Sequence, residues 1–306
     1  MLVSILICTR DRPEKLRRTL EAIAQLSVPL GVDFEVLVLD NGSGNDLTAN
    51  TCRDLQSTLS GRLWGFRIPI AGKSRAANAG FELSRGSIVA FLDEDIVPRK
   101  DWLAVICQHF SEDAGLGVIT GRVELLDKED LPVGIRLSDQ RIVLQDLADL
   151  YLLIGCNLAI RREVVDRVGL FDVNLGPGSR AGFHEDHDFF YRAWRAGEKI
   201  VYEPSLFVYH GHGRQSAAQA VSIKRSYAMG RGAFFAKQIL KHDWLILRAT
   251  YWELRSETRN LFGKSGQSSA QQLSWLLSGF YNYCLIRASQ FIRSQDDRFQ
   301  ASQFLP

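Results

Sequence analysis

The sequence has no closely spaced pair of cysteines and no apolar stretch long enough to span a membrane. Its five cysteines are widely spaced along the 306 residues and contain no CxxC pair. This argues against a disulfide framework and a structural zinc site, and it favours a reducing compartment. The most apolar stretch, 273–286, falls short of the roughly 20 residues that a spanning helix needs.

The chain also has little net charge. Its formal charge is +2, with 46% hydrophobic and 24% charged residues, which is typical of a globular protein and does not favour nucleic acid as a partner. The first residues, MLVSILICTRDR, place the apolar run before the basic residues, the reverse of a signal peptide. We therefore expect a cytoplasmic protein, and leave open peripheral contact with the inner face of a membrane.

Apolar runs of strand length alternate with helical patterns in the first part of the chain. The expected strands are 2–8, 34–39, 66–70, 87–92, 117–123 and 206–209, and the expected helices before residue 110 are 13–26, 46–59, 74–83 and 102–110. Uninterrupted apolar strands separated by helices indicate a mainly parallel sheet that is covered on both faces. The expected fold class is therefore α/β.

The pattern changes after residue 215. The stretches 218–241, 243–261 and 270–293 read as helices, so we expect a first domain over 1–215 and a helical C-terminal region over 216–306. Aromatic and basic residues interleave in these helices. Such helices either lie in a membrane interface or pack on one another, on the first domain or across an oligomer, and both alternatives stay open.

Three carboxylates follow the expected strand 87–92, in the stretch FLDEDIVP. Ligands of parallel sheets bind at the carboxyl ends of the strands, where Asp93 and Asp95 could share one hard cation with phosphate oxygens and water. The alternative is a solvated turn, because acidic residues are common after strands. Two other polar clusters, Thr9–Arg12 and Asp40–Gly42, follow strands at the same expected edge.

Four segments in this order resemble the family 2 glycosyltransferases of the GT-A fold. They are VSILICTRDRPEKLRRTLEAI, VLVLDNGSGNDLT, GKSRAANAGFELSRGSIVAFLDEDIVP and GFHEDHDFFYRAWRAGEKI, and the likeness covers residues 2–212. The resemblance implies a GT-A catalytic domain over 1–215 that binds a nucleotide-sugar, most commonly a UDP-sugar. It also implies transfer to the hydroxyl of a glycan or lipid-linked acceptor, with inversion at the anomeric carbon.

The resemblance also implies site residues and a divalent cofactor, Mn²⁺ or Mg²⁺. The implied metal ligands are Asp95, Asp93 and His210, with His212 as an alternative histidine. The implied donor-binding residues are Thr9, Arg10, Asp40, Lys73, Arg75, Asn78, Asp93 and Glu94. The family often has an arginine directly before the asparagine, whereas Ala77 stands there in this sequence, so the basic residue that meets the phosphate stays open.

The stretch HEDHDFFYR carries the implied catalytic base. Its acidic residues stand at the start of an expected helix, where the helix dipole favours ionised carboxylates. In the family the aspartate of the Glu-Asp pair takes the proton of the acceptor hydroxyl, which corresponds to Asp186 here. Glu185 is the rival for this role.

Two other functions, a sugar-phosphate nucleotidyltransferase and an interaction module without catalysis, are alternatives to a glycosyltransferase. A sugar-phosphate nucleotidyltransferase typically has a glycine-rich basic loop after its first strand, and TRDRPEKLRR contains no glycine. A catalytically inactive interaction module of the same fold would be expected to lack Asp95 or Asp186, and both are present. The donor sugar, the acceptor, the role of the C-terminal helices and the oligomeric state cannot be deduced from this sequence.

Overall fold

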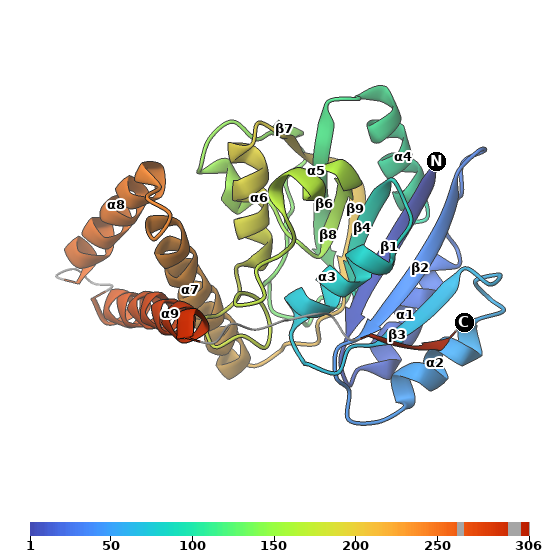
Figure 1. Cartoon of the computed structure of the whole chain (residues 1–306), viewed down its shortest axis with the longest axis horizontal. Helices are drawn as coiled ribbons and strands as arrows, with labels where there is room; N and C mark the ends of the chain where they lie inside the picture. Colours follow the sequence, from blue (N-terminus) through green and yellow to red (C-terminus); the bar gives the residue numbers. More distant parts are fainter. Residues whose placement is uncertain (262–265, 293–300, 306) are drawn as a thin grey trace. The chain divides into compact units, whose positions relative to one another are not determined.

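The structure is a computed structural model that describes residues 1–261, 266–292 and 301–305. Its first part alternates strands and helices, as the apolar runs predict. In chain order these elements are β1 (Leu2–Thr9), α1 (Pro13–Ile23), β2 (Asp33–Asp40), α2 (Leu47–Leu55), β3 (Leu63–Arg67), α3 (Lys73–Leu83) and β4 (Ile88–Asp93) (Figure 1).

The following elements complete the sheet and add a run of helices. They are β5 (Ile96–Pro98), α4 (Trp102–Glu112), β6 (Leu116–Leu125), β7 (Ile142–Val143), the 3₁₀ turn η1 (Asp149–Leu152), β8 (Asn157–Arg161), α5 (Arg162–Val168), α6 (Glu185–Arg195), β9 (Lys199–His210), α7 (Ala217–Ile239), α8 (Trp244–Asn260), α9 (Gly266–Ile292) and β10 (Ser302–Leu305). The last residue of the helix expected over 270–293 lies outside the described residues.

The strands of the described residues form one mixed sheet. Its order is β10-β3-β2-β1-β4-β8-β6-β9-β5, with β7 paired to β9. The strands β3, β2, β1 and β4 are parallel, as are β6 and β9, whereas β8 runs antiparallel between β4 and β6. This confirms the expected α/β class with a mainly parallel sheet.

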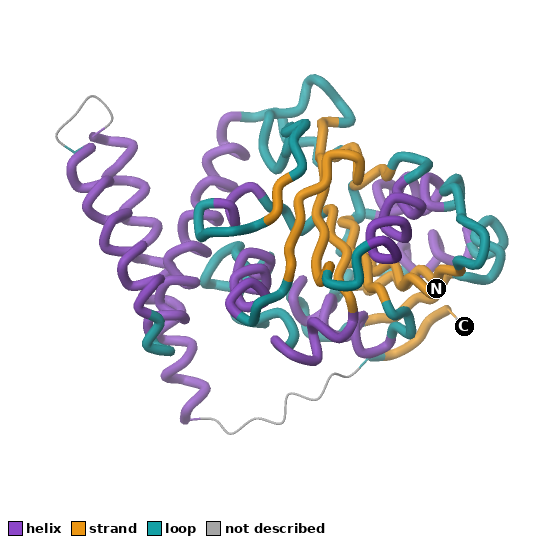
Figure 2. The backbone as a smooth tube through the Cα atoms, turned by 90° about the horizontal axis from the view of Figure 1, so that it is seen from above, coloured by secondary structure: helices purple, strands orange, loops and turns teal. Residues whose placement is uncertain are grey.

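Both faces of the sheet are covered, which explains the uninterrupted apolar runs of β1 and β2. On one face, Ile5 and Ile7 of β1 belong to a buried cluster that includes residues of α1, α2 and α4, among them Leu20 and Trp102. The helix α3 packs on β1 and β2 as well, and helices lie on both sides of the strands (Figure 2). The sheet is therefore the core of this part of the chain.

The strand register places three loop-bearing strand ends side by side. Thr9 lies opposite Asp40 between β1 and β2, and Cys8 lies opposite Asp93 between β1 and β4. Because these strands are parallel, the loops that follow them leave from the same edge. The carboxyl edge therefore gathers the polar clusters that follow β1, β2 and β4.

The strand β3 differs from its expected bounds and is paired on both sides. It spans Leu63–Arg67 rather than 66–70, because Pro69 lacks the N–H that would continue the ladder. Its outer edge pairs antiparallel with β10, which the sequence does not predict. A Cβ on Gly65 would lie 2.2 Å from the ring of Phe304, so this approach requires glycine.

Two further strands depart from the expectation. The sequence does not predict β8, which has only five residues, with Asn157 and Arg161 at its ends and a short apolar run between them. The strand β9 begins at Lys199 rather than at 206. Its first half is not apparent in the sequence because Glu203 and Pro204 interrupt the alternating pattern. Its ladder with β6 shifts register at this level.

The chain divides into two compact units. The first consists of residues 1–171 and 189–215 with the described residues 301–305, and the second consists of residues 172–188 with the described residues from 216 to 292. The helical part of the second unit begins directly after Ser216, whose side chain caps α7. Residues 172–188, which we placed in the first domain from the sequence, group with these helices.

In the second unit, α7 and α9 cross at glycines. A Cβ on Gly232 would lie 1.9 Å from the carbonyl oxygen of Leu276, and a Cβ on Gly279 would lie 1.8 Å from that of Met229. Only residues without a Cβ allow the two backbones to come this close. Within the described ranges, no helix is long and apolar enough to cross a bilayer.

A buried ion network joins residues 172–188 to α7. The Nζ of Lys237 lies 2.9 Å from Oδ2 of Asp172 and 2.8 Å from Oδ2 of Asp188. Gln238 donates to Oδ1 of Asp188 at 3.0 Å, and the hydroxyl of Tyr283 donates to Oδ2 of Asp172 at 2.8 Å. One buried lysine therefore balances two carboxylates, which is what makes these charges tolerable away from water.

Candidate active site

The end of β2 holds a fully buried carboxylate. Asp40 has no exposed surface, and its Oδ1 accepts a hydrogen bond from the backbone N–H of Ser43 at 2.9 Å. Its Oδ2 lies 3.3 Å from Nε of Arg67, at the end of the neighbouring strand β3. A buried charge needs such partners to remain stable. They fix the carboxylate at the edge where the loops of β1 and β4 also emerge.

The hydroxyl of Thr9 is buried at the end of β1 and has no partner among the described residues. Thr9 is 2% exposed, and its Oγ1 makes no hydrogen bond there. Buried hydroxyls are normally paired, so this group is available to a bound molecule or a water. The next residue, Arg10, is about half exposed, and its Nε lies 3.6 Å from Oδ2 of Asp11.

Lys73, the first residue of α3, forms an ion pair with Asp93, the last residue of β4. Nζ of Lys73 lies 2.5 Å from Oδ1 of Asp93, and both side chains are about one quarter exposed. This pair joins the start of α3 to the end of β4. Arg75 stands in the same first turn of α3, with its stem close to Gly72.

Asn78 has a structural partner that the sequence does not reveal. Its Nδ2 donates to the carbonyl oxygen of Phe171 at 2.9 Å, and its Oδ1 accepts from the N–H of the same residue at 3.0 Å. The side chain therefore holds the backbone at Phe171 through both ends of the amide. Its contact with a donor stays a prediction.

Glu94 is the second carboxylate after β4 and is nearly buried. Its Oε1 accepts a hydrogen bond from Nη1 of Arg12 at 3.0 Å. Burial, followed by the charges of Asp95 and Asp93, raises the pKa of Glu94 to about 7. Glu94 thus holds a proton for part of the time near neutral pH, which reduces the repulsion among the three neighbouring acids.

Asp95, the third carboxylate, faces a histidine from the end of β9. The short strand β5 pairs with β9 so that Ile96 lies opposite His210, and the N–H of Gly211 donates to the carbonyl oxygen of Asp95 at 2.8 Å. This register places Nε2 of His210 3.3 Å from Oδ1 of Asp95, and both side chains are more than nine-tenths buried. Nη1 of Arg12 lies 3.2 Å from Oδ2.

The neighbours of Asp95 keep its carboxyl group ionised. Burial alone would raise its pKa, but the hydrogen bond and charge of His210, followed by the charges of Arg12 and Lys15, outweigh it and lower the pKa below its ordinary value. Asp95 is therefore an anion at neutral pH. Glu94, in contrast, is partly protonated near neutral pH, and the carboxylate of Asp93 is paired with Lys73.

The hydrogen bond of Nδ1 of His210 determines the state of Nε2, the ring nitrogen that faces Asp95. Nδ1 lies 3.1 Å from the carbonyl oxygen of Gly134, which can only accept, so Nδ1 carries a proton. Nε2 then directs either a lone pair or a second proton at the carboxylate. A lone pair facing a carboxylate oxygen is repulsive unless a cation lies between them. The arrangement therefore suits a shared proton or a shared metal ion.

The three expected metal ligands are not gathered into one group. Among the described residues, no three His, Cys, Asp or Glu side chains are arranged to hold a metal ion. Asp93 is paired with Lys73, whereas Asp95 and His210 face one another. A carboxylate and an imidazole that donates its other N–H to a backbone carbonyl are chemically suited to a divalent ion. The pair fits two ligands of such an ion.

His212, the alternative histidine, is engaged within the fold. Its Nε2 lies 3.1 Å from the carbonyl oxygen of Leu131, and its Nδ1 accepts from the N–H of Arg214 at 3.0 Å. Burial, followed by the neighbouring His210 and Arg214, lowers its pKa. Both ring nitrogens thus hold the loop after β9, and His210 is the histidine that faces Asp95.

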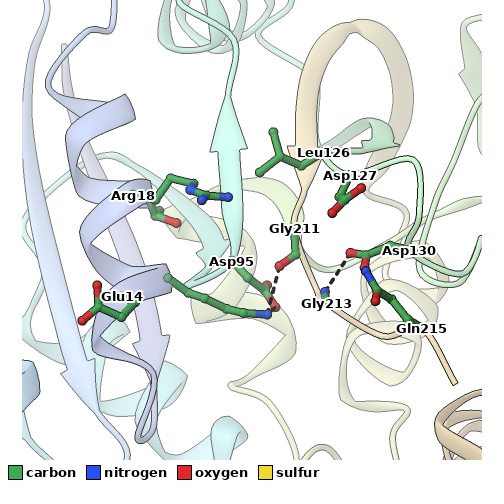
Figure 3. A pocket seen from close by; sticks show the side chains of 11 residues that line it. Glu14, Arg18, Asp95, Leu126, Asp127, Asp130, Gly211, Gly213 and Gln215 are labelled. Atoms are coloured by element: carbon green, nitrogen blue, oxygen red, sulfur yellow. Dashed lines mark hydrogen bonds and ion pairs between the residues drawn. The ribbon is translucent and has the colours of Figure 1, made fainter.

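A cavity of about 260 Å³ opens beside Asp95 (Figure 3). It is lined by Glu14, Lys15, Arg18, Thr19, Asp95, Leu126, Asp127, Asp130, Gly211, Gly213 and Gln215. Nζ of Lys15 donates to the carbonyl oxygens of Gly211 at 2.9 Å and of His212 at 2.7 Å, and lies 3.8 Å from Oδ2 of Asp95. Lys15 thereby joins the start of α1 to the end of β9.

The sequence interpretation missed Arg12 and Lys15 as neighbours of the carboxylates. Both stand at the first turn of α1, three residues apart, so they lie on the same side of the helix. The signal was present in the stretch TRDRPEK, directly after a strand that ends at the expected ligand edge. What the sequence does not contain is the position of this helix start relative to Glu94 and Asp95.

The expected base lies in the second unit. Glu185, Asp186 and Asp188 occupy the first turn of α6. Oδ1 of Asp186 accepts from the backbone N–H of His187 at 2.8 Å and lies 2.9 Å from its Nδ1. Burial would raise the pKa of Asp186, but the charge and hydrogen bond of His187 outweigh it and lower the pKa. With 23% of its side chain exposed, Asp186 is an ionised carboxylate that a ligand can reach.

The family of the chain follows from comparison with known proteins. Residues 4–169 match the family described as Glycosyl transferase family 2, which is more than half of the chain. The chain therefore belongs to this family and is a glycosyltransferase, as the resemblance implies.

Relatives and solved structures agree with this assignment. The chain is 28% identical over 254 residues to the succinoglycan biosynthesis protein ExoM of Rhizobium meliloti strain 1021, which covers 81% of this chain and 80% of that protein. It is 25% identical over 257 residues to the glycosyltransferase AglE of Haloferax volcanii, covering 81% of this chain and 77% of that protein.

Two solved structures share the fold. The mannosyltransferase PcManGT from Pyrobaculum calidifontis, in complex with GDP-Man and Mn²⁺, has a TM-score of 0.60 at 16% identity and covers 93% of this chain and 87% of that chain. Residues 1–349 of S. aureus TarS, in complex with UDP-GlcNAc, have a TM-score of 0.59 at 15% identity and cover 98% and 94%. These likenesses confirm the expected GT-A fold with additional helices.

Proposed function

We propose that this glycosyltransferase moves a sugar from a nucleoside diphosphate donor, UDP in the first instance, to an acceptor hydroxyl with inversion at the anomeric carbon. The observation that carries the proposal is the pair formed by Asp95 and His210 at the sheet edge. The same edge holds the buried carboxylate of Asp40 and the unpaired hydroxyl of Thr9. A solved relative of the same fold was studied with UDP-GlcNAc, and another with GDP-Man.

The ends of β1 and β2 would hold the nucleoside. The carboxylate of Asp40, which Arg67 and the N–H of Ser43 hold in place, would accept a further hydrogen bond from the N–H of a base ring. The hydroxyl of Thr9 would find its missing partner on the bound nucleotide. Arg10 would contribute positive charge at the rim.

The residues after β4 and at the start of α3 would meet the diphosphate. Lys73 and Arg75 would supply cations for its oxygens. Until the donor binds, Asp93 balances Lys73, and the neighbouring Glu94 accepts a hydrogen bond from Arg12. Asp95 and His210 would hold the divalent ion, Mn²⁺ or Mg²⁺. When bound, such an ion neutralises the charge that develops on the leaving diphosphate.

Asp186 would act as the base of the reaction. The acceptor oxygen attacks the anomeric carbon while the bond from this carbon to the diphosphate oxygen breaks, and the electron pair leaves with the nucleoside diphosphate. Asp186 takes the proton of the acceptor hydroxyl, since its low pKa keeps it ionised and its side chain is partly exposed. Attack opposite the leaving group inverts the configuration.

We further propose that the first unit, with residues 1–171 and 189–215, binds the donor in a cytoplasmic enzyme that acts in polysaccharide or glycolipid biosynthesis. A relative with 28% identity is named for succinoglycan biosynthesis, which supports a saccharide acceptor, free or lipid-linked. The linkage formed would follow from the acceptor.

A thermal-shift screen tests the donor assignment. UDP, GDP and dTDP are each added with Mn²⁺ or with a chelator, and pyrophosphate serves as the control for binding through phosphate alone. At a ligand concentration about 100 times Kd, binding stabilises the folded protein by about 2.7 kcal/mol, which is a shift of a few degrees. We expect UDP with Mn²⁺ to give the largest shift. A shift that is independent of the base, or of Mn²⁺, would contradict the proposal.

A further inference from the structure

The outer face of α8 carries aromatic and basic side chains. Seven exposed residues, each three or four positions from another member of the group, make up this face, which we call the α8 stripe: Trp244, Leu247, Arg248, Tyr251, Trp252, Arg255 and Arg259. Residues at this spacing share one side of a helix. A helix at the surface of a globular protein normally turns polar residues outward, so the two tryptophans, the tyrosine and the leucine need an explanation.

The large rings of the α8 stripe are open to solvent. Trp244 is 77% exposed, Tyr251 56% and Trp252 54%. The opposite face of α8 packs within the second unit, where Ile246 and Thr250 are buried. The inner face therefore anchors the helix, and the rings of the stripe contribute little to its folding.

A second run of exposed apolar residues lies on α9. Leu277 is 56% exposed, Tyr281 62% and Leu285 49%, at intervals of four residues that place them on one side of the helix. The same side carries Ser274 and Ser278 and no charged residue among these positions. The second unit thus exposes large apolar side chains on two of its helices.

The charge of the helical region is strongly unbalanced. Residues 216–292 contain ten Lys and Arg but only three Asp and Glu, whereas the whole chain contains 37 and 35. None of the three acids lies on the α8 stripe. Asp243 caps α8 through the N–H of Leu245, Glu253 lies 3.1 Å from Arg231, and Glu257 is partly buried. The basic residues on the face of the exposed rings, Arg248, Arg255 and Arg259, therefore have no acidic residue beside them on the stripe.

We propose that the α8 stripe lies in the headgroup region of an anionic phospholipid bilayer and holds the enzyme at a membrane surface. Trp and Tyr favour this region because their rings are apolar and their N–H and O–H groups reach water. Basic side chains near the surface are attracted to anionic headgroups. A helix with this combination lies in the plane of the membrane and does not cross it.

A second copy of the chain fits the α8 stripe less well than an anionic surface. In a twofold contact the same patch faces itself, so Arg248, Arg255 and Arg259 of one copy would meet the same residues of the other. The stripe offers no acidic residue to pair with them. Like charges across an interface oppose association, whereas anionic headgroups complement this charge.

Vesicle flotation of the full-length chain tests the proposal. Vesicles of phosphatidylcholine alone are compared with vesicles that also contain phosphatidylglycerol, at low and high salt. We expect binding only to the anionic vesicles, and loss of binding at high salt. The double variant R248Q/R255Q should bind about 25-fold more weakly, from about fivefold for each charge. The matched control K100Q/K128Q removes two exposed lysines of the first unit and should bind as the unchanged chain does.

Trp244→Ser combined with Trp252→Ser tests the contribution of the rings. The tryptophan emission of the unchanged chain should shift to shorter wavelength with anionic vesicles, and this double variant should lose most of the shift. Leu30→Ser, at a fully exposed position of the first unit, is its control.

Three outcomes would overturn the proposal: no binding to either kind of vesicle, equal binding to both, or a dimer in light scattering that the stripe substitutions dissociate. Thermal melts show whether the variants fold. If a variant does not fold, the dependence of the unchanged chain on salt and on lipid charge still decides.

Discussion

Three consecutive carboxylates, the last residue of β4 and the two that follow it, are each accommodated by a different physical effect. Asp93 is paired with Lys73 on α3, Glu94 is partly protonated because its pKa is about 7, and Asp95 is held ionised by His210 and Arg12. Only the last of the three has a partner that suits a metal ion. In the proposed function the two aspartates would therefore have separate tasks: Asp93 would balance Lys73, and Asp95 would bind the ion.

Asp95→Asn tests the second of these tasks. The amide keeps the shape of the side chain but removes the charge, so we expect Mn²⁺-dependent binding of the nucleoside diphosphate to weaken by more than about tenfold. Calorimetric titration with and without Mn²⁺ measures this effect. Asp127→Asn, at an exposed position that lines the same cavity, is the matched control and should change affinity little. Equal behaviour of the two variants would remove Asp95 as a ligand.

Asp186→Asn tests the base. A positioned acid or base contributes about 10²- to 10⁴-fold to a reaction rate, so kcat should fall within that range while the affinity for the donor stays near normal. Glu185→Gln is the matched control, because neighbouring residues on a helix point in different directions. Steady-state transfer and donor titration are measured on both variants. A larger loss for Glu185→Gln would reverse the two roles.

Part of the candidate site was visible in the sequence because it depends on local order. Asp40 and Asp93 are the last residues of strands whose apolar runs are unmistakable, and parallel strands bring their ends together. The resemblance implied that Asp95 and His210 share a site, but the residue pattern alone could not predict their contact, because it depends on the register of β5 against β9. The hydrogen bonds between Asn78 and Phe171 could not be predicted either, because the two residues are 93 positions apart in the sequence.

At the scale of elements, the helix α7 depends on one buried lysine. Lys237→Met should destabilise the second unit by about 3–5 kcal/mol, because Asp172 and Asp188 would remain buried without their cation. Urea unfolding followed by circular dichroism measures the loss. Lys224→Met, at an exposed position of the same helix, should stay within about 0.5 kcal/mol of the unchanged chain.

The same network predicts a dependence of stability on pH. Burial would raise the pKa of Asp172, but the charge and hydrogen bond of Lys237 outweigh it and lower the pKa below its ordinary value of 3.8. A lowered pKa gives stability that is fully present above the ordinary value and is lost as pH falls through the lowered pKa. In Lys237→Met, the deficit in stability should shrink toward low pH, where the carboxyl group of Asp172 becomes neutral. A deficit that is independent of pH would argue for a packing effect instead.

The crossing of α7 and α9 should be sensitive to a single methyl group. Gly279→Ala places a Cβ where the carbonyl oxygen of Met229 lies only 1.8 Å away, so the helices must separate. Overpacking of this kind costs about 1–3 kcal/mol, which thermal unfolding detects as a lower Tm. Gly44→Ala is the control, since nothing lies within 4 Å of its added Cβ. An unchanged Tm in Gly279→Ala would mean that the crossing is loose.

Elements were predictable where one period dominates the sequence. The strands β1, β2 and β4 and the helices α7 and α8 lie close to their expected bounds, because uninterrupted apolar runs or long helical patterns specify them locally. The strand β8 and the first half of β9 were missed, since they are short or contain Glu203 and Pro204 and are stabilised by their neighbours in the sheet. Residues 172–188 show no regular period, and their packing on α7 depends on contacts distant in sequence.

At the scale of the whole molecule, the proposed reaction has a stereochemical result that is easy to observe. An inverting transfer from a donor in which the sugar is α-linked to the diphosphate gives a β-linked product. The coupling constant of the anomeric proton, measured by NMR on the product formed from such a donor, reports this configuration. A product with retained configuration would contradict a single displacement assisted by Asp186. Asp186→Asn should slow the reaction without changing its stereochemistry.

The pairing of β3 with β10 also affects how the chain is made. A ribosome completes Leu63–Arg67 more than two hundred residues before Ser302–Leu305, which is a delay of roughly ten seconds or more at ordinary rates of synthesis. During this time the outer edge of β3 has no hydrogen-bonding partner, although the inner edge can already pair with β2. An open strand edge is a template for pairing with another chain. The nascent protein would therefore be vulnerable to misassembly at this edge and a client for chaperones until translation reaches Phe304, whose ring then covers Gly65.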